Sequence, residues 1–344
     1  ELKASQIEEY ARQISRQMRT FSQDRMVIES VRAFSNAFGS IRGELADRSS
    51  EFGDFDARLE QYYEDEFLPR LNSRREAPAS VQDYWPPDAS ARLLQYFFIA
   101  DNENPAGSKR LLDSAKDYSS YGAAHELYPP VFRSFLEEFG YYDIFLVENE
   151  GGHIVYSVAK EIDFGTSLLT GPYKDTNFAS VFRRAREAES PNDIFIEDFR
   201  PYAPSYDEQA SFIASPIFDG TAQVGVLIFQ MPVSRINDLM TSKGNWASVG
   251  MGETGESYLV GADYTARSQL RLLLEDPEEL AVAMQAAGIA GSVVERIQET
   301  KDSIGLAPVE SAASQAALGG EAGAGLVDSW LGVDVLAAYR PLAI

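Results

Sequence analysis

The middle of the chain carries a pair of strand-like segments that restricts the possible folds more than any other feature. Residues 141–148 and 153–158 are rich in β-branched and aromatic side chains, and Gly151-Gly152 lies between them. Two such runs joined by a Gly-Gly turn are typical of a β-hairpin, because glycine readily adopts the positive φ angles that tight hairpin turns need. We therefore expect an antiparallel sheet to begin here.

A second strand pair follows further along the chain. Residues 210–218 and 224–231 have a similar composition and are joined through Asp219-Gly220. Between the two hairpins, residues 175–188 place apolar side chains at helical spacing, which predicts a helix covering one face of the sheet. An antiparallel sheet with a helical insertion between its hairpins resembles PAS-like ligand sensors.

The N-terminal region repeats apolar residues at alternating spacings of four and three. The stripe consists of Ile7, Ala11, Ile14, Met18 and Phe21, and it continues approximately through Ile28, Val31, Phe34, Phe38, Ile41 and Leu45. This pattern predicts one long amphipathic helix, or two helices with a break. The stripe either packs on its own domain or also pairs with a second protomer, and the two accounts are compatible.

The remaining segments complete a plan of three regions. We expect further helix from about residue 56 to 98 with a break near Pro69, helices at 130–139 and 233–240, a strand within 252–261, helix within 277–300, and late strands near 326–330 and 335–339. The second unit would repeat the first in reduced form. The predicted regions are a helical region at 1–120, a first module at 121–240 and a second module at 241–344.

Composition excludes several classes of partner. The chain has 53 acidic and 30 basic side chains and a formal net charge of -23, which would repel nucleic acid and anionic membrane surfaces. It contains no cysteine, so disulfides, thiol nucleophiles and cysteine-ligated metals are excluded. No apolar run is long enough to cross a bilayer. Because the chain begins and ends abruptly inside element-like patterns, we expect flanking membrane segments outside it.

Three motif matches do not support chemistry. Residues 250–255 match G-x-G-x-x-G, but a strand is expected after them, where a dinucleotide site needs a helix. Residues 163–165 read Asp-Phe-Gly without the other protein-kinase motifs. His125 and His153 are the only histidines, and no catalytic trio or metal-ligand pair can be assembled around them. We expect neither an enzyme, nor a cofactor, nor a metal site.

Two segments carry a resemblance to a known family. Phe139-Gly140-Tyr141-Tyr142-Asp143 and the Gly-Glu-Thr-Gly-Glu-Ser-Tyr-Leu-Val-Gly-Ala-Asp run at 252–263 resemble the extracytoplasmic double Cache sensor region of bacterial chemotaxis receptors and of related membrane-bound cyclases and sensor kinases. The resemblance implies an α+β fold with a long N-terminal helix and two PAS-like modules with antiparallel sheets. It also implies a periplasmic location in a membrane-anchored receptor, with a small-molecule ligand in the membrane-distal module, residues 121–240.

Aromatic and polar residues of that module form the predicted ligand site. They are Tyr156, Phe164, Thr166, Tyr173, Asp198, Tyr202, Tyr206, Ser211 and Phe212. Aromatic walls with a few polar groups are characteristic of small-molecule pockets. The alternative for each aromatic residue is an ordinary place in the hydrophobic core.

The predicted site also carries an expectation about ligand charge. Asp198 is the candidate buried anion, which favours a ligand with a cationic or hydrogen-bond-donating group; alternatively, Asp198 pairs with Arg200 or caps a turn. Amino-acid-sensing members of the resembled family carry an arginine and a tryptophan within the segment that corresponds to 163–173. This chain has neither there. We therefore expect that an ordinary α-amino acid is not bound by that scheme.

Three functions follow from these observations. The first is a ligand sensor that transmits a conformational change across the membrane, in a receptor whose output is chemotaxis, a nucleotide cyclase or a histidine kinase. The second is a structural or adhesion ectodomain, and the third is a hydrolase with an unrecognised site. We expect the isolated chain to be a monomer or a weak dimer, with any contact along the N-terminal helix.

Overall fold

The computed structural model describes residues 2–343. The chain forms two compact units. One comprises residues 15–232, and the other comprises residues 233–343 together with the first residues up to 14.

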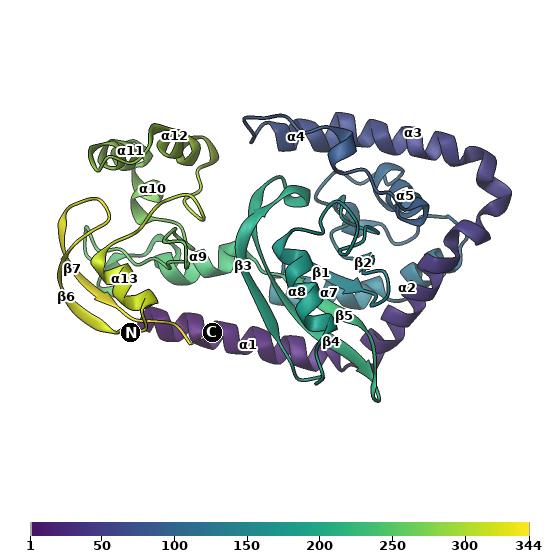
Figure 1. Ribbon diagram of the computed structural model, residues 1–344, viewed down its shortest axis with the longest axis horizontal. Coiled ribbons are helices and arrows are strands. Elements are labelled where there is room, and N and C mark those ends of the chain that lie inside the picture. Colours follow the sequence, from purple (N-terminus) through teal and green to yellow (C-terminus); the bar gives the residue numbers. More distant parts are fainter. Residues whose placement is uncertain (1, 344) are drawn as a thin grey trace. The chain divides into compact units, whose positions relative to one another are not determined.

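A five-stranded antiparallel sheet forms the centre of the 15–232 unit (Figure 1). Its strands are β1 (Asp143–Val147), β2 (Ile154–Ser157), β3 (Phe195–Tyr202), β4 (Glu208–Asp219) and β5 (Ala222–Gln230). The spatial order is β2-β1-β5-β4-β3, and every neighbouring pair is antiparallel. Both predicted hairpins are confirmed, and the chain is α+β as the sequence indicates. β3 was not anticipated.

The N-terminal stripe forms two helices rather than one. They are α1 (Leu2–Ser22) and α2 (Arg25–Glu44). The break occurs where Asp24 adopts an extended conformation and its carboxylate accepts a hydrogen bond from the Met26 amide at 2.8 Å, which caps α2. Most of the stripe is buried within the chain, including Ile14, Met18 and Phe34. The stripe therefore serves the chain's own core.

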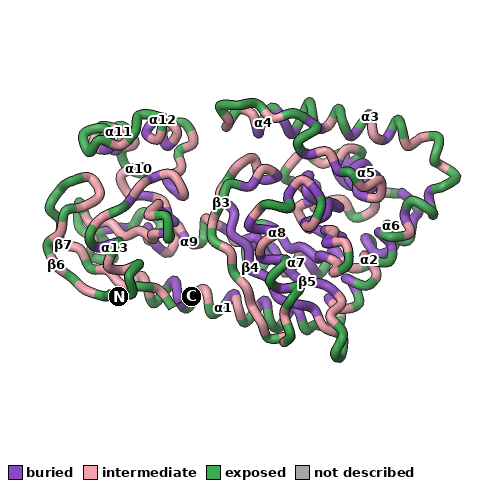
Figure 2. The backbone as a smooth tube through the Cα atoms, in the orientation of Figure 1, coloured by how far each residue is buried: buried purple, intermediate pink, exposed green. Residues whose placement is uncertain are grey.

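Helices cover both faces of the five-stranded sheet. On one face, here called the loop face, α8 (Asn177–Arg186) packs on β3, β4 and β5. The loop face also carries α3 (Phe52–Tyr62) and α4 (Leu68–Asn72), whose apolar side chains join one core with Phe145, Phe178 and Phe212. On the opposite face, here called the helix face, lie α2, α6 (Ser120–Leu127) and α7 (Pro129–Phe139). β1, β2, β4 and β5 are largely buried between these layers, as Figure 2 shows for β4 and β5, whereas β3 is mostly half-buried or exposed.

Two helices contain wide turns next to the loop face. α3 continues through a π-helical segment (Tyr63–Phe67) into α4, where the Leu68 amide donates to the Tyr63 carbonyl. Pro69 follows at once and has no amide to donate, so the predicted break near it is a loosened turn within a continuing helix. A second π segment, Tyr96–Ala100, ends α5 (Ala89–Gln95).

Short 3-10 turns link the other elements. They are Ala46–Glu51, Val81–Asp83, Lys109–Leu111, Ala203–Ser205, Ser242–Gly244 and Ala247–Val249.

The other unit is smaller in sheet content. Its elements are α9 (Val233–Thr241), α10 (Arg271–Glu275), α11 (Pro277–Ala286), α12 (Gly291–Thr300), α13 (Ala312–Leu318), β6 (Gly323–Asp328) and β7 (Asp334–Tyr339). β6 and β7 form a two-stranded antiparallel sheet, so the two late strands are confirmed. The predicted helical stretch at 277–300 is divided near Gly288, whose φ is +78°.

The strand predicted within 252–261 is wrong. In that segment only Val260 makes an isolated bridge, to Ala266. The reason is visible in the hydrogen bonds: the Arg271 guanidinium donates to the carbonyls of Gly255 at 2.8 Å and Gly252 at 3.1 Å. These carbonyls are therefore taken by a side chain instead of a neighbouring strand.

Close approach of α2 to the sheet gives a first prediction. A Cβ atom at Gly225 of β5 would lie 2.6 Å from Val31 Cγ2 and 2.9 Å from the Val147 carbonyl oxygen. Gly225→Ala should therefore lower the free energy of unfolding by about 1 to 3 kcal/mol. Gly39→Ala, within α2 and with no atom within 4 Å of its added Cβ, is the control and should raise it by about 0.5 to 1 kcal/mol. Chemical denaturation measures both, and a neutral Gly225→Ala would contradict the packing described.

Candidate ligand-binding site

The loop that follows β2 brings a carboxylate beneath the helical layer on the loop face. Asp163 is fully buried, and its Oδ2 accepts a hydrogen bond from the Tyr202 hydroxyl at 2.5 Å. Its Oδ1 has no hydrogen-bond partner among the described residues. Burial raises the pKa of Asp163 to about 7, and the negative charge of Asp143 adds to the shift, while the Tyr202 hydrogen bond opposes it.

A second carboxylate lies two residues earlier. Glu161 accepts hydrogen bonds from the Tyr142 hydroxyl at 2.6 Å and from Ser205 Oγ at 2.9 Å. Burial raises the pKa of Glu161 well above its ordinary value, and the charge of Asp163 raises it further. In the described part of the chain, neither Glu161 nor Asp163 forms an ion pair with a lysine or arginine. The two acids thus form an acidic pair without a cation, in which Asp163 is fully buried and Glu161 is half-buried.

Two further polar atoms near this acidic pair have no hydrogen-bond partner within residues 2–343. Ser205 Oγ, which donates to Glu161, accepts from Gln230 Nε2 at 3.1 Å, and the carbonyl oxygen of the same Gln230 side chain is buried without a partner. The Tyr173 hydroxyl is also buried without a partner. A buried polar group without a hydrogen bond costs about 1 to 3 kcal/mol, so such groups point to a missing partner.

Aromatic rings wall this polar cluster, as the sequence predicted for part of the set. The ring centroids of Tyr173 and Tyr202 lie 6.0 Å apart, and those of Tyr202 and Phe212 lie 5.2 Å apart in an edge-to-face arrangement. Tyr84 stacks near Tyr173 at 6.1 Å. Tyr173, Tyr202 and Phe212 are therefore brought together, each at most 2% exposed. Because the cluster is closed to solvent, a ligand can enter only if the loop or the helical layer moves.

Four other residues of the predicted site lie around this cluster and make other contacts. Thr166 is buried and donates to the Asp163 carbonyl at 2.6 Å, so it shapes the loop. The ring of Phe164 packs towards Phe98 instead, at 6.1 Å. Tyr206 is partly buried and packs near Phe67. Ser211 donates to the carbonyl of Glu197 on the neighbouring strand at 2.7 Å.

Tyr156 lies on the helix face of the sheet, away from the predicted site. A β-bulge between β1 and β2 pairs Leu146 with Tyr156 but Val147 with Ile154, so Ile154 and Tyr156 do not share a face as an unbroken strand would require. Ile154 belongs to the core of the loop face, whereas the Tyr156 ring stacks on Phe34 of α2 at 4.9 Å. The expected place of Tyr156 in the pocket wall is therefore wrong.

Asp198 is not a buried anion, which corrects a second expectation. Its side chain is exposed on β3, and its carboxylate accepts from the Phe199 amide at 2.7 Å. A bulge between Glu197 and Arg200 interrupts the strand at this point. The buried acid that the sequence argument sought is Asp163, within a segment that drew attention only as a false kinase motif and as part of the ligand loop.

Gln95, which sequence reasoning missed, holds the loop in place. Its side-chain amide donates to the carbonyls of Ile162 at 2.6 Å and Phe164 at 2.8 Å, the two residues that flank Asp163. Its carbonyl oxygen accepts from the Tyr63 hydroxyl at 2.7 Å. Tyr63 begins one π segment and Gln95 immediately precedes the other. The sequence offers one signal for this residue, a glutamine within an otherwise apolar helical segment, but it does not show the partners of Gln95, which lie far away along the chain.

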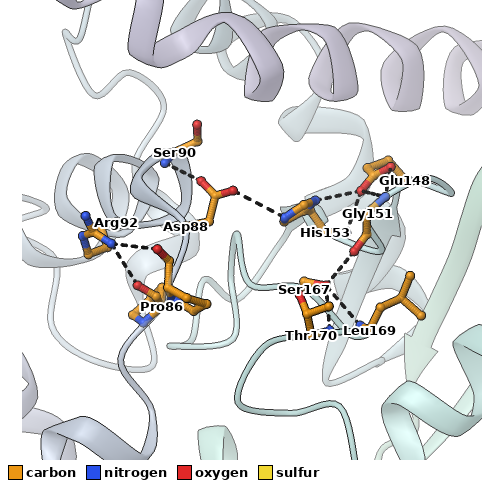
Figure 3. A network of polar contacts seen from close by, with 11 residues as sticks. Pro86, Asp88, Ser90, Arg92, Glu148, Gly151, His153, Ser167, Leu169 and Thr170 are labelled. Atoms are coloured by element: carbon orange, nitrogen blue, oxygen red, sulfur yellow. Dashed lines mark hydrogen bonds and ion pairs between the residues drawn. The ribbon is translucent and has the colours of Figure 1, made fainter.

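The other end of the loop is fastened to the start of β2 (Figure 3). Ser167 Oγ donates to the Gly151 carbonyl at 2.6 Å and accepts from the amides of Leu169 and Thr170 at 3.1 Å. Next to it, the His153 ring lies between two carboxylates, with Nδ1 2.8 Å from Glu148 Oε1 and Nε2 3.6 Å from Asp88 Oδ2. The loop is thus tied to the sheet and, through Gln95, to the helical layer.

Within residues 2–343, no group of three or more histidine, cysteine, aspartate and glutamate side chains is arranged to hold a metal ion. No helix in that range is both long and apolar enough to span a bilayer.

No protein-family model and no curated protein matches the chain. Among solved structures, the chain is similar to the sensor domain of the V. cholerae histidine kinase DctB, at 15% identity and a TM-score of 0.27, over 54% of this chain and 60% of that one. It is also similar to the ligand-binding domain of the Pseudomonas fluorescens chemoreceptor CtaA in complex with L-serine, at 13% identity and a TM-score of 0.26, over 66% of this chain and 73% of that one. The chain thus spans less than two thirds of the DctB sensor domain. Because both TM-scores are low, the description of the fold rests on this chain's own strand order and contacts.

The hydrogen bonds by which Gln95 holds the loop in place give a second prediction. Gln95→Met preserves the length of the side chain but removes its hydrogen bonds, which leaves two carbonyls and the Tyr63 hydroxyl unsatisfied in the core. The free energy of unfolding should fall by about 3 kcal/mol. Gln61→Met, at an exposed helical position, is the matched control and should change stability by less than about 0.5 kcal/mol. Chemical denaturation measures the free energy of unfolding of both variants. Equal values would show that the hydrogen bonds of Gln95 do not hold the loop.

Proposed function

We propose that this chain is the extracytoplasmic ligand-binding part of a membrane-anchored signalling receptor, and that the ligand binds at the acidic pair on the loop face. The observation that carries the proposal is the buried Asp163 carboxylate, which has an unsatisfied oxygen, no cationic partner and walls of tyrosine. A site that served only stability would be better filled by apolar side chains, because burying an uncompensated charge is costly. A bound ligand would supply the partner that the Asp163 carboxylate lacks.

The ligand class follows from the charges of the site. Asp163 and Glu161 supply negative charge, and the unsatisfied oxygens of Asp163 and Gln230 can only accept hydrogen bonds from a ligand while Asp163 is ionised. Since no lysine or arginine of the described chain pairs with either acid, nothing there favours a ligand carboxylate. A primary amine or another cation without a neighbouring carboxylate fits these groups. An α-amino acid fits less well, in agreement with the absence of arginine from 163–173.

The hydrogen bonds that hold the loop would transmit the effect of ligand binding to the rest of the structure. A ligand shifts a conformational equilibrium only by its differential affinity for the two states. A cation bound at Asp163 would favour the arrangement in which Gln95 holds the loop against the helical layer. Chemotaxis, a cyclase and a histidine kinase all remain candidate outputs. The predicted dimer contact along α1 would have to use the exposed face of that helix, because Ile14 and Met18 are buried.

The alternatives make different demands on the same residues. An adhesion ectodomain would leave Asp163 without a partner in its functional state. A hydrolase would need a nucleophile or an activated water beside a general base, and we propose that the acidic pair binds and does not catalyse. Thermal denaturation in the presence of a small-molecule panel separates these functions.

The panel gives a third prediction. Primary amines should stabilise the protein, by about 2.7 kcal/mol at one hundred times the dissociation constant. L-serine, other α-amino acids and dicarboxylates should have little effect. Asp163→Asn should weaken the best amine by about 2 to 5 kcal/mol, because it removes one partner of a desolvated charge pair. Asp198→Asn, an exposed acid on β3, is the control. Stabilisation by dicarboxylates, or equal amine binding by Asp163→Asn, would contradict the proposal.

Stability should also depend on pH through Asp163, which gives a fourth prediction. In the folded protein its pKa is about 7, whereas an unfolded aspartate has a pKa of about 3.9. Between these values the folded state holds a proton that the unfolded state has released. The free energy of unfolding should therefore fall as pH rises from about 4 to about 7, and then level off.

Asp163→Asn should reduce the decrease in the free energy of unfolding between about pH 4 and about pH 7, and Asp198→Asn should leave this decrease unchanged. Denaturation of the unliganded protein across this pH range measures the slopes. A wild-type slope of opposite sign, or one that Asp163→Asn leaves intact, would show that Asp163 is not the buried acid that titrates here.

A further inference from the structure

Lys160 follows β2 and lies near Tyr156 on the helix face, where it has several energetically unfavourable features. Its side chain is only 2% exposed, and its backbone adopts a left-handed conformation with φ of 58°, which is unfavourable for a residue with a Cβ. Among the described residues its amine makes one hydrogen bond, which is long, 3.5 Å from Nζ to the Ser157 carbonyl oxygen. A buried ammonium needs several good acceptors. This position provides them poorly, so stability does not explain the residue.

Two polar atoms that have no hydrogen-bond partner in the described part of the chain accompany Lys160. Its Nζ lies 5.5 Å from the centre of the Tyr156 ring, and the Tyr156 hydroxyl is buried without a partner. The His125 ring centroid is 6.3 Å from that of Tyr156, and His125 Nε2 is also buried without a partner. His125 Nδ1 lies 3.2 Å from the Asp113 carbonyl, an acceptor, so Nδ1 carries the proton and Nε2 carries a free lone pair.

The remaining charged groups around Lys160 already have partners. Asp143 on β1 accepts hydrogen bonds from Ser157 Oγ and from the amides of Ile144, Val158 and Ala159. Arg133 on α7 donates to Asp113 at 2.6 Å. The groups left over in this cluster are therefore an amine, a hydroxyl and an imidazole lone pair.

Burial also leaves part of the amine uncharged near neutral pH. Desolvation lowers the pKa of Lys160 to about 7; the charge of Asp143 opposes this shift and that of Arg133 adds to it. Burial likewise lowers the pKa of His125, and the positive charge of Lys160 lowers it further. An uncharged amine is a nucleophile, whereas an ammonium is not.

We propose that Lys160 reversibly binds carbon dioxide as a carbamate. The lone pair of the neutral amine forms a bond to the carbon of CO2, one C=O π bond opens to give the carboxylate, and the amine proton released passes to His125 Nε2. The products are a carbamate and an imidazolium, so charge and atoms balance. CO2 is small and uncharged, and it can reach an amine that is 2% exposed, whereas larger carbonyl compounds would require the cluster to open.

The three leftover groups suit this product. The Tyr156 hydroxyl can donate to a carbamate oxygen, and the protonated His125 can donate a charge-assisted hydrogen bond. Replacing the positive ammonium by a negative carbamate also removes the charge that disfavours protonation of His125. Since Asp143 interacts with Lys160 and with Asp163, the carbamate would add negative charge near the acidic pair. The CO2 site does not depend on the proposed ligand function.

Chemical trapping of the intact chain tests the inference. The protein is equilibrated with ¹³C-labelled CO2 at about pH 7.5, treated with triethyloxonium to ethylate carbamates, and analysed by peptide mass spectrometry. Glycylglycine in the same sample, whose amino group forms a carbamate, verifies the trapping. A labelled ethyl carbamate on Lys160 is expected. Lys109 is the internal control: it is also buried, but its amine donates to the Asn102 carbonyl at 2.7 Å. Trapping of glycylglycine without Lys160, or of Lys109 as much as Lys160, overturns the proposal.

Two variants test the cluster separately from the lysine. Tyr156→Phe and His125→Gln should each reduce trapped occupancy at Lys160 about tenfold, the loss expected for one hydrogen bond to a charged group. Thermal denaturation verifies that each variant is folded, and the wild-type result stands without them. Unchanged occupancy in both folded variants would show that the surrounding groups do not support a carbamate.

Discussion

The hydrogen bond between Asp163 and Tyr202 organises the loop face of the sheet. A carboxylate removed from water must find donors; this one accepts a hydrogen bond from the Tyr202 hydroxyl, while its Oδ1 has no partner among the described residues. The flanking carbonyls are drawn the other way, to Gln95, so the backbone on both sides of Asp163 is fixed while one carboxylate oxygen stays unsatisfied. In the proposed receptor, a ligand that enters when the loop or the helical layer moves would supply the missing interaction, and because Gln95 already holds the loop in this arrangement, little further ordering would be needed.

The two faces of the sheet carry opposite chemistry. On the loop face, the unsatisfied atoms around Glu161 and Asp163 are two acceptors, Asp163 Oδ1 and Gln230 Oε1, and the Tyr173 hydroxyl, and the charge is negative. On the helix face, the leftover groups lie around the amine of Lys160. Asp143 stands between them, because its charge influences Lys160 on one side and Glu161 on the other. A change in the charge of Asp143 would therefore act on the groups of both faces.

Local patterns predicted the fold well where local physics decides it. Both hairpins were found because runs of β-branched and aromatic residues around glycine turns act over a few neighbouring residues, and Asp24 is a cap of the same local kind. β3 was missed because it is largely exposed, contains Pro201 and is interrupted by a bulge. Tyr156 was expected in the pocket wall but lies on the other face, because a bulge shifts the register between β1 and β2 and a bulge cannot be seen in the sequence. Gln95 could not be found, because its role depends on partners brought from distant segments.

Proton release on ligand binding is the most direct test of the central claim, that a cation binds beside the buried carboxylate of Asp163. Calorimetric titration with the best amine, at about pH 6.5 in buffers of different ionisation enthalpy, counts the protons exchanged. A bound cation favours the ionised carboxylate, so the account predicts that protons are released and that Asp163→Asn reduces their number. Proton uptake, or release that is unchanged in Asp163→Asn, would contradict it.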